Sequence, residues 1–227
     1  MASYNIHACI GRDGHYEPAR IAAVINQIKP DIIGLQELDT GYRIHNTGMN
    51  QLQWLEYLTH LHSVTGPLLW GQKGFYGNAI LTKWPIKAVR YHNISVNGYE
   101  PRGILDVELT IAHQSVTFMS THLGLKAQER RVQTDKIIDI IANKPKQLTL
   151  LVGDFNDWFH LFSTIGKLNH YMGRFPLIRT FPTALPLFSL DRIWVKPHTA
   201  LLSLYAYRQK IARLASDHLP IIAHIAL

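Results

Sequence analysis

The chain has 227 residues, of which 47% are hydrophobic and 17% are charged, and this balance excludes a disordered chain. Its one cysteine, Cys9, excludes an intrachain disulfide and a metal site built from several thiolates. The net charge of +7 favours a phosphorylated or polyanionic partner.

The first third of the chain alternates between strand and helix patterns. Residues 2–10 are predicted to form a strand, 17–29 an amphipathic helix, and 31–37 a second strand that ends in a carboxylate. Strand, helix and strand at this spacing predict a βαβ unit. A polar surface loop is expected at 39–50, and Cys9 is expected to be a buried thiol near the end of the first strand.

The middle of the chain changes to short strands after one more helix, predicted at 51–62. Turn signals such as Asn97-Gly98 separate these strands, so they are expected to form an antiparallel meander. The strands are predicted at 68–70, 77–82, 86–96, 103–111 and 115–121.

The last third mixes both patterns. Helices are predicted at 126–142 and 158–170, and the three prolines of 175–189 predict irregular structure there. The strands are predicted at 148–152, 190–195, 201–207 and 219–225. Because no linker or tandem repeat is visible, we expect a single domain over 1–227, in which helices lie outside a β-sandwich. A monomer is expected.

Polar side chains stand at the ends of otherwise apolar strands. Each has an ordinary explanation when taken alone, such as a turn, a helix cap or a surface charge. Together they are hard to explain in this way, because a strand has no structural need to end repeatedly in a carboxylate, an amide or an imidazole. The set comprises Asn5, His7, Glu37, Asn78, Arg102, His122, Asp154, Asn156, Asp191, Asp217 and His218.

This set suits attack of water on a phosphate ester. Oxygen ligands such as Glu37, with Asn5 or an aspartate, favour Mg²⁺ or Mn²⁺. A metal there would polarise the phosphoryl oxygen. A histidine held by a carboxylate is a suitable general base or phosphate ligand near neutral pH, while Asn and Arg side chains donate to phosphate oxygens.

Eight motifs give the sequence its resemblance to a known family. It resembles the endonuclease/exonuclease/phosphatase superfamily of Mg²⁺-dependent phosphohydrolases, which includes deoxyribonucleases, abasic-site endonucleases, inositol polyphosphate 5-phosphatases and bacterial neutral sphingomyelinases. The resemblance implies a DNase I-like fold, a four-layer α/β sandwich of two mixed β-sheets packed face to face with helices outside. The motifs occur in the family's order, as YNIH (4–7), LQEL (35–38), GNAIL (77–81), PRG (101–103), STHLG (120–124), GDFN (153–156), LDRIWV (190–195) and SDHLPI (216–221).

The resemblance also implies roles for individual residues. Glu37 corresponds to the principal metal carboxylate, assisted by Asn5 and Asp217. Asp154 corresponds to the residue that orients or deprotonates the attacking water. His218 corresponds to the histidine beside the scissile phosphate.

Further residues correspond to groups around the phosphate. Asp191 corresponds to the carboxylate that holds the imidazole of His218, and Asn156 to a phosphate-binding neighbour of Asp154. His122 corresponds to a phosphate-contacting histidine of the phosphatase and sphingomyelinase branches. Asn78 and Arg102 correspond to substrate contacts at strand ends.

The substrate is left open by the sequence. His7 stands where abasic-site endonucleases carry an aspartate, which favours a small-molecule or lipid phosphodiester. The positive charge instead favours a DNA or RNA endo- or exonuclease. Aromatic residues that lie partly on predicted loops suit base stacking or peripheral membrane contact, although core packing explains most of them. They are Trp54, Trp70, Phe75, Tyr76 and Trp84.

A second class of function is a non-catalytic binding module that uses the same groove, although the principal site residues are all present. No secretory signal is visible, and no apolar run approaches the ~20 residues of a transmembrane helix. We therefore expect a cytoplasmic protein with no transmembrane segment.

Overall fold

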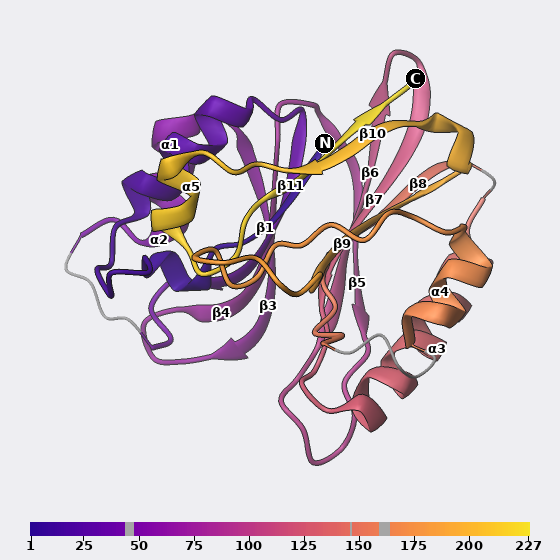
Figure 1. Ribbon diagram of the computed structural model, residues 1–227, viewed down its shortest axis with the longest axis horizontal. Helices are drawn as coiled ribbons and strands as arrows, with labels where there is room; N and C mark the ends of the chain where they lie inside the picture. Colours follow the sequence, from indigo (N-terminus) through magenta and orange to yellow (C-terminus); the bar gives the residue numbers. More distant parts are fainter. Residues whose placement is uncertain (44–47, 146, 159–163) are drawn as a thin grey trace.

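The computed structural model describes residues 1–43, 48–145, 147–158 and 164–227, and it contains two β-sheets that pack face to face (Figure 1). The six-stranded sheet has the order β10-β11-β1-β2-β4-β3, and the five-stranded sheet has the order β5-β6-β7-β8-β9. Both sheets are mixed, because β1 pairs with β2 and β7 with β8 in parallel while their other pairs are antiparallel. The expected four-layer α/β sandwich is confirmed.

The strands of the six-stranded sheet are β1 (Ala2–Asn5), β2 (Ile32–Asp39), β3 (His62–Trp70), β4 (Phe75–Thr82), β10 (Leu201–Ala206) and β11 (Ile221–Ile225). Those of the five-stranded sheet are β5 (Ile86–Asn93), β6 (Gly103–Ile111), β7 (Gln114–His122), β8 (Leu148–Asp154) and β9 (Asp191–Lys196). The helices are α1 (Pro18–Ile28), α2 (Gln51–Thr59), α3 (Ala127–Ala142), α4 (Thr164–Met172) and α5 (Lys210–Ala215), with short 3₁₀ turns at His7–Cys9 and His198–Ala200.

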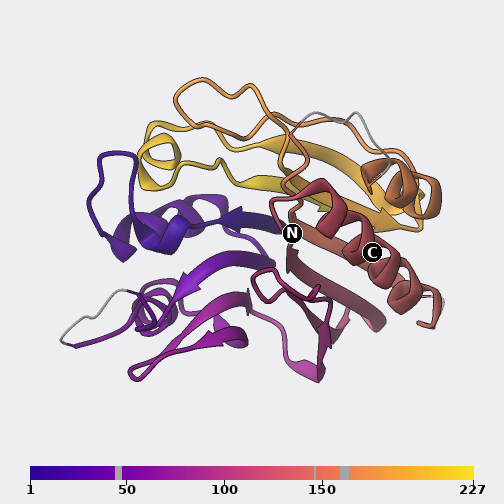
Figure 2. The same cartoon turned by 90° about the horizontal axis from the view of Figure 1, so that it is seen from below.

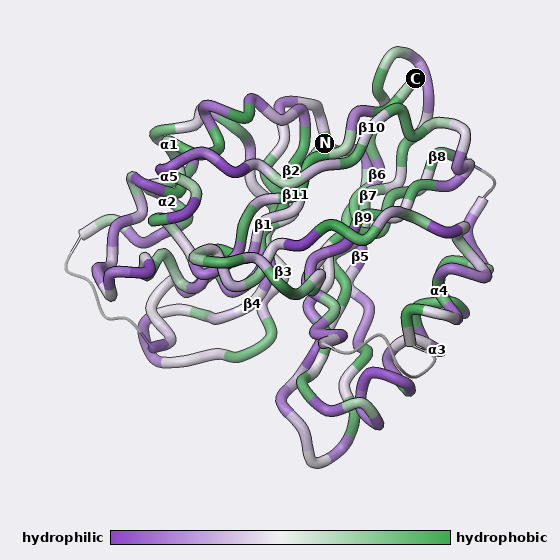
Figure 3. The backbone as a smooth tube through the Cα atoms, viewed as in Figure 1, coloured by the Kyte–Doolittle hydropathy of each residue, from purple (hydrophilic) through white to green (hydrophobic). Residues whose placement is uncertain are grey.

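Three apolar cores separate the four layers. The first joins α1, α2 and α5 to the six-stranded sheet, the second lies between the two sheets, and the third joins α3 and α4 to the five-stranded sheet (Figure 2). The interior strand β8 is buried along its whole length, because it carries core residues on both faces. Figure 3 shows hydrophobic colour along much of the interior strands of the sheets, and mixed hydrophobic and hydrophilic colour along α3 and α4.

The predicted first strand is wrong in its second half. Strand β1 ends at Asn5, and the chain turns through a 3₁₀ segment in which His7, Ala8 and Cys9 all have positive φ. A strand cannot continue through left-handed backbone, so His7 does not share a strand face with Asn5. Cys9 is buried as expected, and burial raises the pKa of its thiol.

Other boundaries differ from the sequence pattern. The meander is divided, because β3 and β4 join one sheet while β5, β6 and β7 form antiparallel pairs in the other. Strand β3 starts at His62, six residues earlier than predicted, and α2 ends at Thr59. The helix predicted at 158–170 is seen from Thr164, and its first part falls largely outside the described residues. Among the described helices, none is long and apolar enough to cross a membrane.

Candidate functional site

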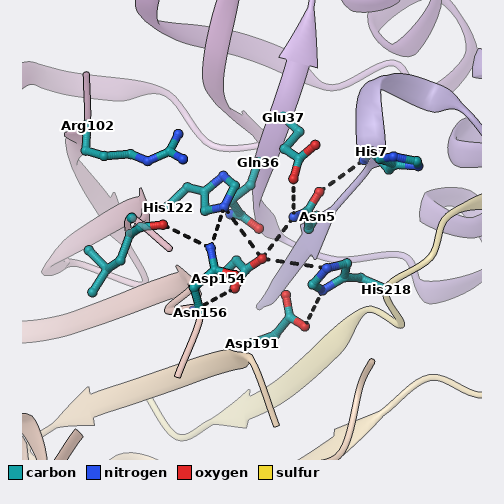
Figure 4. Close-up of polar contacts among 12 residues, drawn as sticks. Asn5, His7, Gln36, Glu37, Arg102, His122, Asp154, Asn156, Asp191 and His218 are labelled. Atoms are coloured by element: carbon teal, nitrogen blue, oxygen red, sulfur yellow. Dashed lines mark hydrogen bonds and ion pairs between the residues drawn. The ribbon is translucent and has the colours of Figure 1, made fainter. Parts of the chain in front are cut away.

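Most of the polar strand ends predicted from the sequence lie together at one edge of the two packed sheets (Figure 4). In the parallel pairs, Asn5 lies opposite Gln36 on β2, and His122 lies opposite Asp154. Asp191, at the start of the antiparallel strand β9, also lies opposite Asp154. Parallel pairing explains this convergence, since the carboxyl ends of parallel strands lie at the same edge of a sheet.

Asp154 lies at the centre of the group and is only 1% exposed. Its Oδ2 accepts a hydrogen bond of 3.0 Å from Asn5 Nδ2, and it lies 3.7 Å from Nε2 of both His122 and His218. Its Oδ1 accepts the backbone N–H of Asn156 at 2.9 Å. Burial raises the pKa of this carboxyl to about 6, against the opposing effect of the His218 charge.

His218 is held by Asp191 on the side facing away from Asp154. Its Nδ1 lies 2.9 Å from Asp191 Oδ2, and the Thr180 hydroxyl donates to the same oxygen at 2.5 Å. Burial lowers the pKa of the imidazole, but the carboxylates of Asp191 and Asp154 outweigh that effect and raise it to about 10. His218 is therefore an imidazolium at neutral pH, with its orientation fixed by Asp191.

His122 is in the opposite state. Burial, together with the positive charges of Arg102 and His218, holds the pKa of its imidazole well below 6.5. Asn156 Nδ2 donates to His122 Nε2 at 3.0 Å and to the Leu123 carbonyl at 3.0 Å, which requires an unprotonated Nε2. The site thus contains one charged and one neutral histidine on either side of Asp154.

Glu37 and Asn5 form the oxygen-rich side of the site. Asn5 Nδ2 donates to Glu37 Oε1 at 2.9 Å, and Asn5 Oδ1 accepts the backbone N–H of His7 at 3.1 Å. Glu37 has φ of 61° and lies where the register between β2 and β4 shifts. Its half-buried carboxylate and the Asn5 amide oxygen are hard donors, and the half-buried carboxylate of Asp217 lies 3.9 Å from His7 Nδ1. This donor set fits Mg²⁺ or Mn²⁺.

A second group, Asp154, Asp191 and His218, also brings three ligand atoms within 4.8 Å of one another. It is the poorer metal site for a chemical reason. One of its three ligand atoms is a nitrogen, whereas Mg²⁺ and Mn²⁺ prefer oxygen, and Asp191 Oδ2 is already hydrogen-bonded twice. The chemistry of the donor atoms therefore favours the oxygen ligands of the Glu37 side for Mg²⁺ or Mn²⁺.

The remaining predicted residues lie at the margins of this cluster. Asn78 on β4 and Arg102 before β6 are buried, and Arg102 Nη1 donates to Glu100 Oε1 at 2.6 Å. The His7 ring is partly exposed, and its Nδ1 lies 3.1 Å from the Ile10 carbonyl, so only its backbone contacts Asn5. A substrate contact by the His7 ring stays a prediction.

Three residues that support the site were not predicted from the sequence. Thr180, within the segment expected to be irregular, supports Asp191. The ring of Phe181 lies 4.7 Å from that of His218, centroid to centroid. Gln36 donates from Nε2 to Ser120 Oγ at 3.1 Å and so links the two sheets beneath the site. Their residue types occur in any core, so no sequence signal distinguishes them.

A family model described as the endonuclease/exonuclease/phosphatase family matches residues 2–218. The chain belongs to this family. A curated relative, the uncharacterized protein YbhP of Escherichia coli K12, is 28% identical over 222 residues, covering 89% of this chain and 86% of that protein.

Two solved family-like structures share the fold. A mannosyl-6-phosphatase from Bacteroides thetaiotaomicron has a TM-score of 0.71 at 17% identity, and the match covers 100% of this chain and 98% of the phosphatase chain. The TDP2 protein of D. rerio, complexed with a single-strand DNA product, has a TM-score of 0.67 at 18% identity. This match covers 98% of this chain and 96% of the TDP2 chain. At these identities the likeness shows the four-layer fold and leaves the substrate open.

Proposed function

We propose that this protein is a phosphoesterase that depends on Mg²⁺ or Mn²⁺ and hydrolyses a small-molecule or lipid phosphodiester or phosphomonoester. The observation that carries the proposal is the buried Asp154 carboxylate between an imidazolium and a neutral imidazole. Charged groups of opposite sign are buried together at a cost, and such arrangements concentrate where a protein performs chemistry.

The side chains divide the reaction between them. The raised pKa of Asp154 makes its carboxylate a suitable acceptor for a proton of the attacking water near neutral pH. As the new P–O bond forms and the bond to the alcohol breaks, negative charge grows on the phosphoryl oxygens. His218 Nε2–H and Arg102 supply donors for that charge, and Asp191 keeps the imidazole of His218 in its charged, oriented form. The predicted phosphate contact of Asn156 would require its Nδ2 to release His122 or the Leu123 carbonyl, which accept its two N–H groups.

Glu37, Asn5 and Asp217 would hold the metal ion. When bound, the ion would supply positive charge beside the phosphoryl and leaving oxygens. The Asn5 amide links this side to Asp154, since its Nδ2 donates to both carboxylates. Loss of the Glu37 or Asp154 carboxylate therefore removes a hydrogen-bond acceptor from Asn5 in addition to the role of that carboxylate in the reaction.

The test is a hydrolysis screen with Mg²⁺ and Mn²⁺, and with EDTA as the negative control. The substrates are bis-p-nitrophenyl phosphate, sphingomyelin, inositol phosphates, RNA, plasmid DNA and abasic duplex. We expect turnover that EDTA abolishes, with Glu37→Gln and Asp154→Asn each reducing kcat/KM by about a hundredfold or more, or ~3 kcal/mol.

Glu56→Gln is the matched control, because Glu56 is also a half-buried glutamate with one side-chain hydrogen bond, from Ser63 Oγ. It is expected to stay within about twofold of the wild type. Full activity in Glu37→Gln or Asp154→Asn would refute the assignment of the site. A wild type that hydrolyses no substrate and binds neither metal in calorimetry would identify a non-catalytic binding module.

A DNA or RNA nuclease is the alternative, favoured by the net charge of +7 and by the DNA product bound to the TDP2 structure. Of the aromatic residues considered for base or lipid contact, Trp70 is 72% exposed at the tip of the β3–β4 hairpin, whereas Tyr76 is buried. Peripheral membrane contact, a monomeric state, a single domain over 1–227 and a cytoplasmic location stay predictions.

A further inference from the structure

A pocket of about 280 Å³ lies beside the candidate active site, at the edge of the sandwich where β3 faces β5 and β6. Asn78 and Arg102 line it. Arg102 is also close enough to His122 for its charge to lower the pKa of that imidazole. These shared residues place the pocket next to the proposed phosphate position, where a group attached to the phosphate would lie.

Two polar side chains of the pocket wall have unused hydrogen-bonding capacity. The residue Asn78 is 2% exposed, and within the described part of the chain its amide is not hydrogen-bonded. Arg102 is 6% exposed, and its Nε–H is buried with no partner among the described residues, although Nη1 contacts Glu100. Buried polar groups are almost always paired, so the Arg102 Nε–H points to an oxygen-bearing ligand, and the Asn78 amide in the same wall offers a donor and an acceptor beside it.

The rest of the lining combines apolar surface with neutral polar groups. Tyr91, which is 63% exposed, stands at the rim, and His92 is held by Asp106 at 2.8 Å. No carboxylate occurs among the described lining residues, and the cation Arg102 is present, so a positively charged ligand would find no partner. A ring that carries hydroxyl groups matches this surface, since its C–H faces are apolar and its edge is polar. The apolar lining includes Pro67, Leu68, Ile104 and Leu105.

The size of the pocket limits the ligand further. A volume of about 280 Å³ lies just below the ~300–1,000 Å³ typical of pockets for drug-sized ligands. One sugar-sized ring fits such a space, whereas two acyl chains do not.

We propose that this pocket binds the organic group esterified to the phosphate and selects an uncharged, hydroxylated ring of sugar size. The inference rests on the proposed function, because that function places the phosphate beside Arg102. It narrows the substrate class from phosphate esters in general to esters of a sugar or of a nucleoside.

The test measures dissociation constants by calorimetry in Mg²⁺, in the Asp154→Asn background so that no ligand is turned over. The ligands share a phosphate group and differ in its substituent, namely methyl phosphate, glucose 6-phosphate, uridine 5′-monophosphate, phosphocholine and dihexanoyl phosphatidate. We expect at least one ring ester to bind about tenfold or more tightly than methyl phosphate. The choline and diacyl esters should stay within about threefold of methyl phosphate. Comparison of the two ring esters distinguishes a sugar from a nucleoside.

Two added substitutions test the pocket itself. Leu68→Trp fills it and Tyr91→Ala opens its rim, so the ring preference should fall below about threefold while methyl phosphate binds as before. Tyr57→Ala on α2 is the control, because Tyr57 is 64% exposed, almost as much as Tyr91, and lies outside the pocket.

Equal binding of ring and methyl esters would overturn the inference, as would a preference for choline or acyl groups or a ring preference that survives Leu68→Trp. Hydrolysis by the parent protein is measured separately with bis-p-nitrophenyl phosphate. Tighter binding of a ring ester by a protein that hydrolyses nothing would refute the proposed function. The same result would still support a hydroxylated ring as the ligand of this pocket.

Discussion

At the scale of single residues, the site gives opposite charge states to two buried histidines. His218 faces two carboxylates, whose charges outweigh burial, while His122 faces Arg102 and the His218 imidazolium. Hydrogen bonds agree with this difference, because His218 contacts an acceptor through Nδ1 and His122 receives a donor at Nε2. Neighbouring groups with divergent pKa values are how one site provides both an acid and a base.

The charge states can be measured directly in metal-free protein, using NMR of the imidazole nitrogens. The pKa of His218 is raised, so its charge should persist below about pH 10 and be lost above it. The pKa of His122 is lowered, so it should remain neutral well below pH 6.5. Asp191→Asn should lower the pKa of His218, because the largest favourable charge and a hydrogen bond are removed.

Asp135→Asn serves as the control for that titration, since Asp135 is an exposed carboxylate on α3 that pairs with Lys167. It should leave both histidines unchanged. A His218 that loses its proton near pH 6.5, or an unchanged value in Asp191→Asn, would show that the two carboxylates do not control its charge.

At the scale of elements, the site is built where strands end or bulge in left-handed backbone. His7, Glu37 and Asn156 have φ of 46°, 61° and 49°. For residues with a Cβ this conformation costs about 1–2 kcal/mol. Strain of this kind persists where the surrounding structure imposes it, and it clusters at functional sites. The bend at Glu37 interrupts the β2–β4 ladder at the point where its carboxylate meets Asn5.

The strain at Glu37 predicts a reversal of the usual glycine effect. In extended backbone, Gly is less stable than Ala by about 0.5–1 kcal/mol. At position 37 that difference should shrink or change sign, because Gly removes a conformational cost of about 1–2 kcal/mol. Chemical denaturation of Glu37→Gly and Glu37→Ala measures it, and Gln36→Gly and Gln36→Ala on the same strand give the reference. The same difference at both positions would mean that Glu37 is not strained.

Much of this could be predicted from the sequence, and the elements show why. The periodicity of 17–29 and the apolar run of 148–152 give α1 and β8, since each pattern is local. The turn at His7 and the register shift at Glu37 have no local signal, because neither position contains the glycine that marks left-handed backbone. Likewise, the support of Asp191 by Thr180 depends on the path of a segment without regular structure.

At the scale of the whole molecule, the two sheets contribute complementary groups. Asn5 and Glu37 come from the six-stranded sheet, while His122, Asp154 and Asp191 come from the five-stranded sheet. The Asn5–Asp154 hydrogen bond and the Gln36–Ser120 hydrogen bond cross between them. The site therefore exists only when the apolar core between the sheets has formed, which explains why its residues are scattered through the sequence.

The pairing of surface cations bears on the choice between the two substrate classes, and it can be tested by the salt dependence of DNA binding. Several cations already contact carboxylates, among them Lys87 and Arg90 with Glu108, and Arg20 with Asp13. Paired cations release few counterions on binding DNA, so the affinity for a plain duplex should depend only weakly on salt. A plot of the logarithm of the association constant against the logarithm of salt concentration should have a slope shallower than about −3 between 50 and 200 mM salt. Fluorescence anisotropy in EDTA, which prevents metal-dependent cleavage, measures this slope. A nuclease that neutralises about six phosphates would show a slope near −5. That result would favour nucleic acid and would imply that the surface pairs open to contact the phosphate backbone.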